Sequence, residues 1–142
     1  MTRVSEKPTI LNAINRLVAE GSTNAGAGLW LAYRLASENF NPEAINRVVL
    51  LSDGVANVGE TGPDQILAAI KEHAAEGITL TTVGMGMGNY NDTLMEQLAD
   101  NGDGFYAYVD SMQEAERIFV DKLTSSLLTI AKDAKLQVEF NP

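Results

Sequence analysis

The feature that most constrains the fold of this chain is an alternation of short apolar runs with segments of helical length. The runs are too short for helices, and the segments between them carry apolar residues three and four positions apart. Strands and helices that alternate in this way build parallel sheets with helical crossovers. The pattern therefore predicts an α/β fold with a doubly wound, mainly parallel sheet and helices on both faces. The expected strands are 48–51, 78–84 and 105–109, and the expected helices are 63–76, 92–100 and a long one beginning after Asp110.

Two more helices are expected before the first strand. The first covers 8–19, where the apolar residues form one stripe, and the second ends near Asn39 at the breaker "NFNP". The strand 48–51 reads "VVLL", without polar alternation, so we expect it to be covered on both faces. Asp110 and Gln113 have the spacing of a capping box at the start of the last helix.

Composition limits the classes of partner. The chain has 142 residues, enough for one domain with a single core. Its net charge of −9 argues against binding to nucleic acid or to an anionic membrane surface, because both require a basic patch. There is no cysteine, which excludes thiolate metal sites and cysteine nucleophiles. No stretch is apolar enough to span a bilayer, and the first ten residues lack the apolar core of a signal peptide.

Asp53 is the residue that points most clearly to chemistry. It follows the apolar strand 48–51 directly, in the sequence "VVLLSDG", and ligands of parallel sheets bind at the carboxyl ends of the strands. An aspartate there can be a metal ligand, a phosphoacceptor or a turn residue. The loop "GSTNAGAGL" adds the hydroxyls of Ser22 and Thr23 just before a helix, although Thr23 is also a good helix N-cap. Oxygen ligands of these kinds suit Mg²⁺.

Enzymatic motifs are not supported. Gly84, Gly86 and Gly88 do not have the spacing of a dinucleotide-binding loop, and neither a P-loop nor a nucleophile elbow occurs in the sequence. His73 lies on a polar helix flank, where we expect it to be solvated, and Trp30 and the pair Tyr106 and Tyr108 fit core or strand packing. We therefore expect a binding module rather than an enzyme.

The combination of motifs resembles the von Willebrand factor A-type domain, in particular its bacterial members. The matching segments are "EGSTNAGAGL" before a helix, "RVVLLSDGVANVG" as strand and loop, "ITLTTVGMGMGNYNDTLMEQLADNGDGFYAYV" as the next two strands, and the closing helix. The resemblance implies a partial von Willebrand factor A domain over residues 1–133, with 134–142 as the start of a C-terminal continuation.

The resemblance also implies a metal-ion-dependent adhesion site built from three loops. Thr23 would supply the second loop's ligand and Asp53 the third, and the rim or outer positions would be Ser22, Ser52, Gly54 and Asn57. The first element, Asp-x-Ser-x-Ser, occurs nowhere in the sequence. The resemblance therefore implies an N-terminally truncated domain in which Mg²⁺ or Mn²⁺, the cation of the complete domain, binds weakly or not at all.

The same resemblance implies a class of partner. In the complete domain, the cation would join Thr23 and Asp53 to an acidic residue of a protein ligand. Strand 48–51 would lack its family neighbour, and the sheet face on the side of the last helix would be partly uncovered, so we expect self-association through this strand. The implied compartment is the bacterial envelope or periplasm, with the cytoplasm as the alternative. A phospho-signalling receiver domain with Asp53 as phosphoacceptor is the alternative function.

Overall fold

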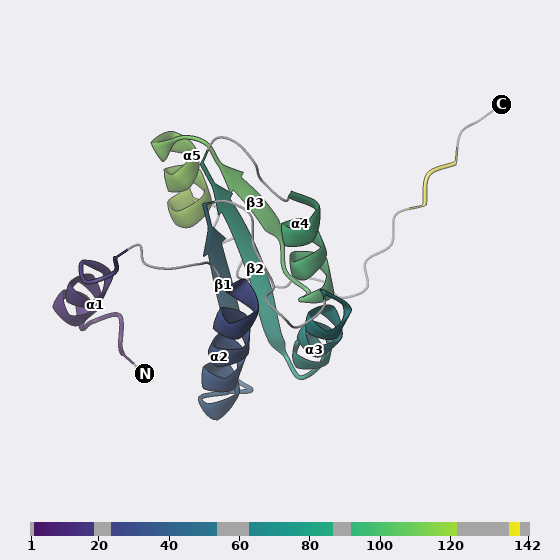
Figure 1. Ribbon diagram of the computed structural model, residues 1–142, viewed down its shortest axis with the longest axis horizontal. Coiled ribbons are helices and arrows are strands. Elements are labelled where there is room, and N and C mark those ends of the chain that lie inside the picture. Colours follow the sequence, from purple (N-terminus) through teal and green to yellow (C-terminus); the bar gives the residue numbers. More distant parts are fainter. Residues whose placement is uncertain (1, 19–23, 54–62, 87–91, 122–136, 140–142) are drawn as a thin grey trace.

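The computed structural model describes residues 2–18, 24–53, 63–86, 92–121 and 137–139. Within these ranges, three strands are interleaved with helices in the predicted order (Figure 1). The strands are β1 (Asn46–Ser52), β2 (Ile78–Met85) and β3 (Tyr106–Val109). The helices are α1 (Lys7–Ile14), α2 (Ala25–Glu38), α3 (Pro63–Ala75), α4 (Asp92–Asn101), α5 (Met112–Glu116) and a π-helical turn, η1 (Arg117–Asp121).

The sheet is parallel throughout, with the strand order β1-β2-β3. Asn46 pairs with Ile78 and Ser52 with Gly84, and farther along β2, Thr82 pairs with Tyr106. Helices α2, α3 and α4 pack against one face of the sheet, and α5 and η1 pack against the other. Figure 1 shows α3 and α4 on one side of the strands and α5 on the other. This arrangement confirms the predicted α/β class with helices on both faces.

The main core lies between the sheet and the three helices α2, α3 and α4. Its most deeply buried side chains come from all these elements, because each helix turns one apolar stripe inward. Thr82 is also fully buried there, and its hydroxyl donates to the carbonyl of Met95 at 2.8 Å, which ties α4 to β2. The largest fully buried side chains are Ile70, Ile78, Leu80, Met95, Leu98, Val83 and Thr82.

Strand β1 is covered on one face only, which corrects the expectation that both faces are buried. Val48 is 7% exposed and faces the main core, whereas its neighbours Val49 and Leu51 are 46% and 52% exposed. Successive side chains of a strand point to opposite faces, so both exposed residues lie on the face that carries α5. α5 packs against β3 and leaves Val49 and Leu51 half-exposed. The expectation of an uncovered apolar surface on this face is therefore confirmed.

The N-termini of α2 and α5 are capped by other polar residues than the sequence predicts. The N-cap of α2 is Asn24, whose side chain accepts from the Ala27 amide at 3.0 Å. That bond makes the N-cap interpretation of Thr23 wrong. The last helix is capped by Ser111, which accepts from the Glu114 amide at 3.2 Å, so the predicted Asp110 cap is also wrong.

Two other expectations need correction. α1 ends at Ile14 rather than at residue 19, and none of its residues is buried, so its apolar stripe lacks the packing that would extend it. Trp30 is 45% exposed on α2 and is not a core residue.

His73 is partly buried rather than fully solvated. Its ring stacks on that of Tyr33 with a centroid distance of 4.5 Å and an angle of 10° between the planes, and its Nδ1 lies 3.2 Å from a Glu76 carboxylate oxygen. Tyr33 is 2% exposed, and among the described residues no group hydrogen-bonds its hydroxyl. Burial raises the pKa of Tyr33 above its ordinary value.

Replacement of Tyr33 by Phe is expected to raise the free energy of unfolding by up to about 1 kcal/mol at neutral pH, because it removes a buried hydroxyl without a partner. Above a pH of about 10, the unfolded state loses the Tyr33 proton and the folded state keeps it, so wild-type stability falls as pH rises. Tyr33→Phe removes that part of the alkaline decline. Urea denaturation at neutral pH and at about pH 11 measures both effects; a large loss at neutral pH would contradict the assignment.

Candidate cation site at the carboxyl edge of the sheet

Asp53 lies where the sequence predicts it, one residue beyond the end of β1. Its side chain is exposed, and the preceding residue, Ser52, is half-buried and pairs with Gly84 of β2. All three strands run parallel, so their carboxyl ends meet at this edge. The structure therefore presents the Asp53 carboxylate to solvent at the edge where parallel sheets bind ligands.

The backbone around Asp53 is closely packed by the turn that follows β2. Gly86 has a φ of +104°, and a Cβ built on it would lie 3.3 Å from the Asp53 carbonyl oxygen. The carbonyl of Gly86 accepts a hydrogen bond from the Tyr108 hydroxyl of β3. The hydrogen bond between Tyr108 and Gly86 could not be predicted from the sequence. A glycine outside any dinucleotide-binding motif and a single strand tyrosine do not indicate a contact between neighbouring strand ends.

The other predicted site residues lie outside the described ranges. Thr23, with Ser22 in the same loop, and Gly54 and Asn57 after Asp53 belong to this group. The convergence of Thr23 with Asp53 therefore stays a prediction.

The described donor atoms fit a hard cation in kind. The Asp53 carboxylate and the Ser52 hydroxyl are oxygen donors of the type that Mg²⁺ and Mn²⁺ prefer. Within the described ranges, no group of three or more His, Cys, Asp or Glu side chains could hold a metal ion together. One carboxylate compensates little of the dehydration of a divalent ion, and weak binding of the cation by this chain stays a prediction.

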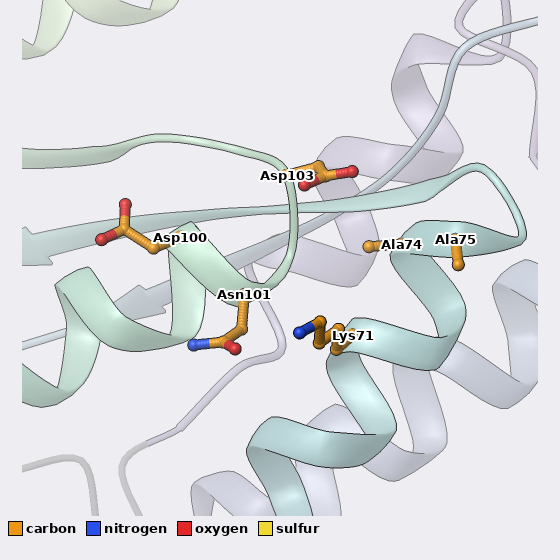
Figure 2. Close-up of a pocket in the computed structure, with 6 residues that line it drawn as sticks. All are labelled: Lys71, Ala74, Ala75, Asp100, Asn101 and Asp103. Carbon is orange, nitrogen blue, oxygen red and sulfur yellow. The ribbon is translucent and has the colours of Figure 1, made fainter. Parts of the chain in front are cut away.

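A hollow lies at the opposite edge of the sheet from Asp53, between the ends of α3 and α4 (Figure 2). It has a volume of about 340 Å³. Asp100 and Asp103 supply carboxylates, and Lys71 projects its ammonium group from the facing helix. The helices carrying these residues end where β2 and β3 begin, far from the strand ends near Asp53. A mixture of both charges makes the hollow a poorer cation site than its two carboxylates alone suggest.

These features define a class of protein: a parallel α/β domain that presents a carboxylate at the carboxyl edge of its sheet. The chain belongs to the von Willebrand factor type A domain family, whose model matches residues 1–121. The family match confirms the resemblance drawn from the motifs and does not favour the receiver-domain alternative.

Similar sequences occur in bacteria and animals. The chain is 46% identical to YfbK of Escherichia coli (strain K12) over 138 residues, which cover 97% of this chain and 24% of YfbK. It is 29% identical to the human inter-alpha-trypsin inhibitor heavy chain H2 over 120 residues, or 81% of this chain and 12% of that protein. The chain thus spans a quarter or less of the length of these two relatives.

Two solved structures share the fold. BatB from Bacteroides thetaiotaomicron superimposes with a TM-score of 0.56 at 21% identity, over 77% of this chain and 62% of BatB. Proximal thread matrix protein 1 of the mussel byssus superimposes with a TM-score of 0.57 at 24% identity, over 85% of this chain and 30% of that protein. These likenesses support the α/β architecture.

None of the helices in the described ranges is long and apolar enough to cross a membrane.

Proposed function

We propose that this chain is part of a protein-binding module that recognises an acidic residue of a protein ligand through Mg²⁺ or Mn²⁺. The observation that carries the proposal is the exposed Asp53 carboxylate at the carboxyl edge of the sheet, in a chain of the von Willebrand factor type A family. Asp53 and Thr23 hold the cation, and Ser22, Ser52, Gly54 and Asn57 form the rim.

Charge explains why the cation is needed for recognition. The chain has a net charge of −9, so an acidic side chain of a ligand that approaches Asp53 directly is repelled. A divalent cation between the two carboxylates replaces this repulsion with two attractive contacts. The same chain can then distinguish an acidic ligand from a neutral one by its requirement for the cation. This mechanism involves no chemical step, in keeping with the proposed role as a binding module rather than an enzyme.

The test of this proposal is the effect of Mg²⁺ on thermal unfolding in wild type and Asp53→Asn. A ligand present at about ten times its Kd stabilises the folded state by about 1.4 kcal/mol. We expect Mg²⁺ at millimolar concentration to raise the unfolding temperature of wild type more than NaCl of equal ionic strength does. Asp53→Asn removes this difference, because the neutral amide binds the cation poorly.

The matched control is Asp103→Asn, which removes a carboxylate of the opposite hollow. It should leave the response to Mg²⁺ unchanged. A response that survives in Asp53→Asn, or that is lost in Asp103→Asn, would contradict the proposal.

We further propose that a second copy of the chain covers β1. In the described part of the chain, only β2 pairs with β1, so its other edge exposes backbone groups beside the half-exposed Val49 and Leu51. Tyr33 is on the side of α2 that contacts α3, where its ring stacks on His73. Leu31 and Leu35, each 49% exposed, lie on the opposite side of α2, away from α3. Apolar residues thus border β1 on both faces of the sheet.

The one charged residue of β1 does not protect this edge. Arg47 directs its Nε to the Thr79 hydroxyl at 3.2 Å, and its guanidinium lies 6.0 Å from the centroid of the Phe105 ring. Both contacts hold the side chain over β2 and the segment before β3 rather than across the open edge. An edge without a projecting charge favours pairing with another strand, and two copies of β1 can pair around a twofold axis.

A further inference from the structure

We infer that Tyr108 and Gly86 are positioning residues for Asp53, and that they set the affinity of the cation site by holding the Asp53 backbone in place. This inference rests on the proposed function of Asp53 as a cation ligand. Two contacts carry it: the hydrogen bond from the Tyr108 hydroxyl to the Gly86 carbonyl, and the close approach of Gly86 to the Asp53 carbonyl.

Gly86 allows the turn after β2 to pass against Asp53. Its φ of +104° is a conformation that residues with a side chain rarely adopt. A Cβ at this position would approach the Asp53 carbonyl oxygen to 3.3 Å, closer than most contacts of this kind. The absence of a side chain therefore lets the turn after β2 pass close to the Asp53 carbonyl, where it limits how far the Asp53 backbone can move.

Tyr108 holds this turn from the third strand, β3. It pairs with Gly84 of β2, and its hydroxyl donates to the carbonyl of Gly86, two residues farther along the chain. β1 and β3 are not neighbours, because β2 lies between them. The hydrogen bond joins Tyr108, on the outer strand β3, to Gly86 in the turn after β2. Because Gly86 also lies close to Asp53, the turn links Tyr108 to the residue that follows the other outer strand, β1.

The connection matters because Asp53 is exposed and lies beyond the last paired residue of its strand. A ligand in such a place loses conformational freedom when it binds a cation, which lowers affinity. Contacts that fix the backbone beforehand reduce this loss, and removal of groups that orient metal ligands typically lowers affinity by about tenfold or more. Tyr108 and Gly86 supply such contacts without touching the cation.

The test compares Tyr108→Phe with Tyr106→Phe. Tyr106 lies on the same face of β3, and its hydroxyl donates to Asp92 at the start of α4, at 2.5 Å. Two quantities are measured by NMR in each variant: the carbonyl carbon shift of Asp53 without any divalent cation, and the Kd for Mg²⁺. Tyr108→Phe should change the shift and raise the Kd by roughly tenfold, whereas Tyr106→Phe should change neither.

The outcomes separate this inference from the proposed function. An Asp53 shift that is unchanged in Tyr108→Phe overturns the inference whether or not Mg²⁺ binds. If the shift changes but wild type shows no response to Mg²⁺ that depends on Asp53, the proposed function fails and the positioning of the Asp53 backbone stands. Gly86→Ala gives a second test: it should move the Asp53 shift further than Tyr108→Phe does, and an unmoved shift in a folded Gly86→Ala chain contradicts the close contact.

Discussion

Gly104→Ala is expected to lower the free energy of unfolding by more than about 3 kcal/mol, the largest effect of any single methyl addition considered for this chain. A Cβ on Gly104 would lie 1.7 Å from the carbonyl oxygen of Leu80 and 2.5 Å from its carbonyl carbon. Both are backbone atoms of β2, so no side-chain rotation relieves the overlap. Leu80 itself is fully buried, which prevents the strand from moving outward.

The position matters because the segment before β3 pairs with the first half of β2. The Leu80 amide donates to the Gly102 carbonyl at 2.8 Å, and the Thr82 amide donates to the Phe105 carbonyl at 3.1 Å. Displacement of Gly104 from β2 would break these bonds and open the core around Leu80. The loss would appear as a lower midpoint in urea denaturation.

Gly28→Ala is the matched control. Gly28 is exposed within α2, and no atom lies within 4 Å of a Cβ placed on it. The same chemical change there should raise the free energy of unfolding by about 0.5–1 kcal/mol, because alanine favours the helix more than glycine does. A Gly104→Ala chain as stable as wild type would contradict the close approach of this segment to β2.

Leu51→Lys is expected to abolish the proposed pairing of two copies through β1. Leu51 is half-exposed beside the open edge of β1, where a second copy would cover it. A lysine there would place a charge beside the edge that a second strand must approach, and charged side chains at a sheet edge oppose strand pairing. The dimer dissociation constant should rise by at least about a hundredfold, which corresponds to about 2.7 kcal/mol.

Light scattering after size exclusion, over a range of protein concentrations, measures this change. Met112→Lys is the control, since Met112 is 84% exposed and lies on α5, which packs against β3. It should leave the association unchanged. A wild-type chain that is monomeric at every concentration, with the β1 amides protected from hydrogen exchange, would contradict self-association through this strand.

The sequence predicted the fold where local pattern and tertiary packing agree. Ile66 and Ile70 lie at helical spacing and are both buried in α3, and Gly77 ends that region with a φ of +96°. Asp53 also lies at the predicted strand end, because a short apolar run followed by Ser-Asp-Gly has few alternatives in a parallel sheet.

Other features depend on contacts that a single sequence does not reveal. "VVLL" looks the same whether one or both faces are covered, so the exposure of Val49 could not be derived from the run itself. Asn24 and Ser111 cap their helices although Thr23 and Asp110, one residue earlier, have similar capping preferences. His73 looks polar and peripheral in its helix, and only the approach of α2 brings Tyr33 against its ring.

Paramagnetic broadening of NMR signals by Mn²⁺ tests most directly the proposal that Asp53 is a cation ligand of this domain. Trace Mn²⁺ broadens the signals of nuclei near the bound ion, so the pattern of broadened signals locates the ion on the domain. We expect the amides of Ser52, Asp53 and Gly86 to broaden first, and we expect Asp53→Asn to abolish the effect. Broadening centred on Asp100 and Asp103, or broadening around Ser52 that persists in Asp53→Asn, would contradict the proposal.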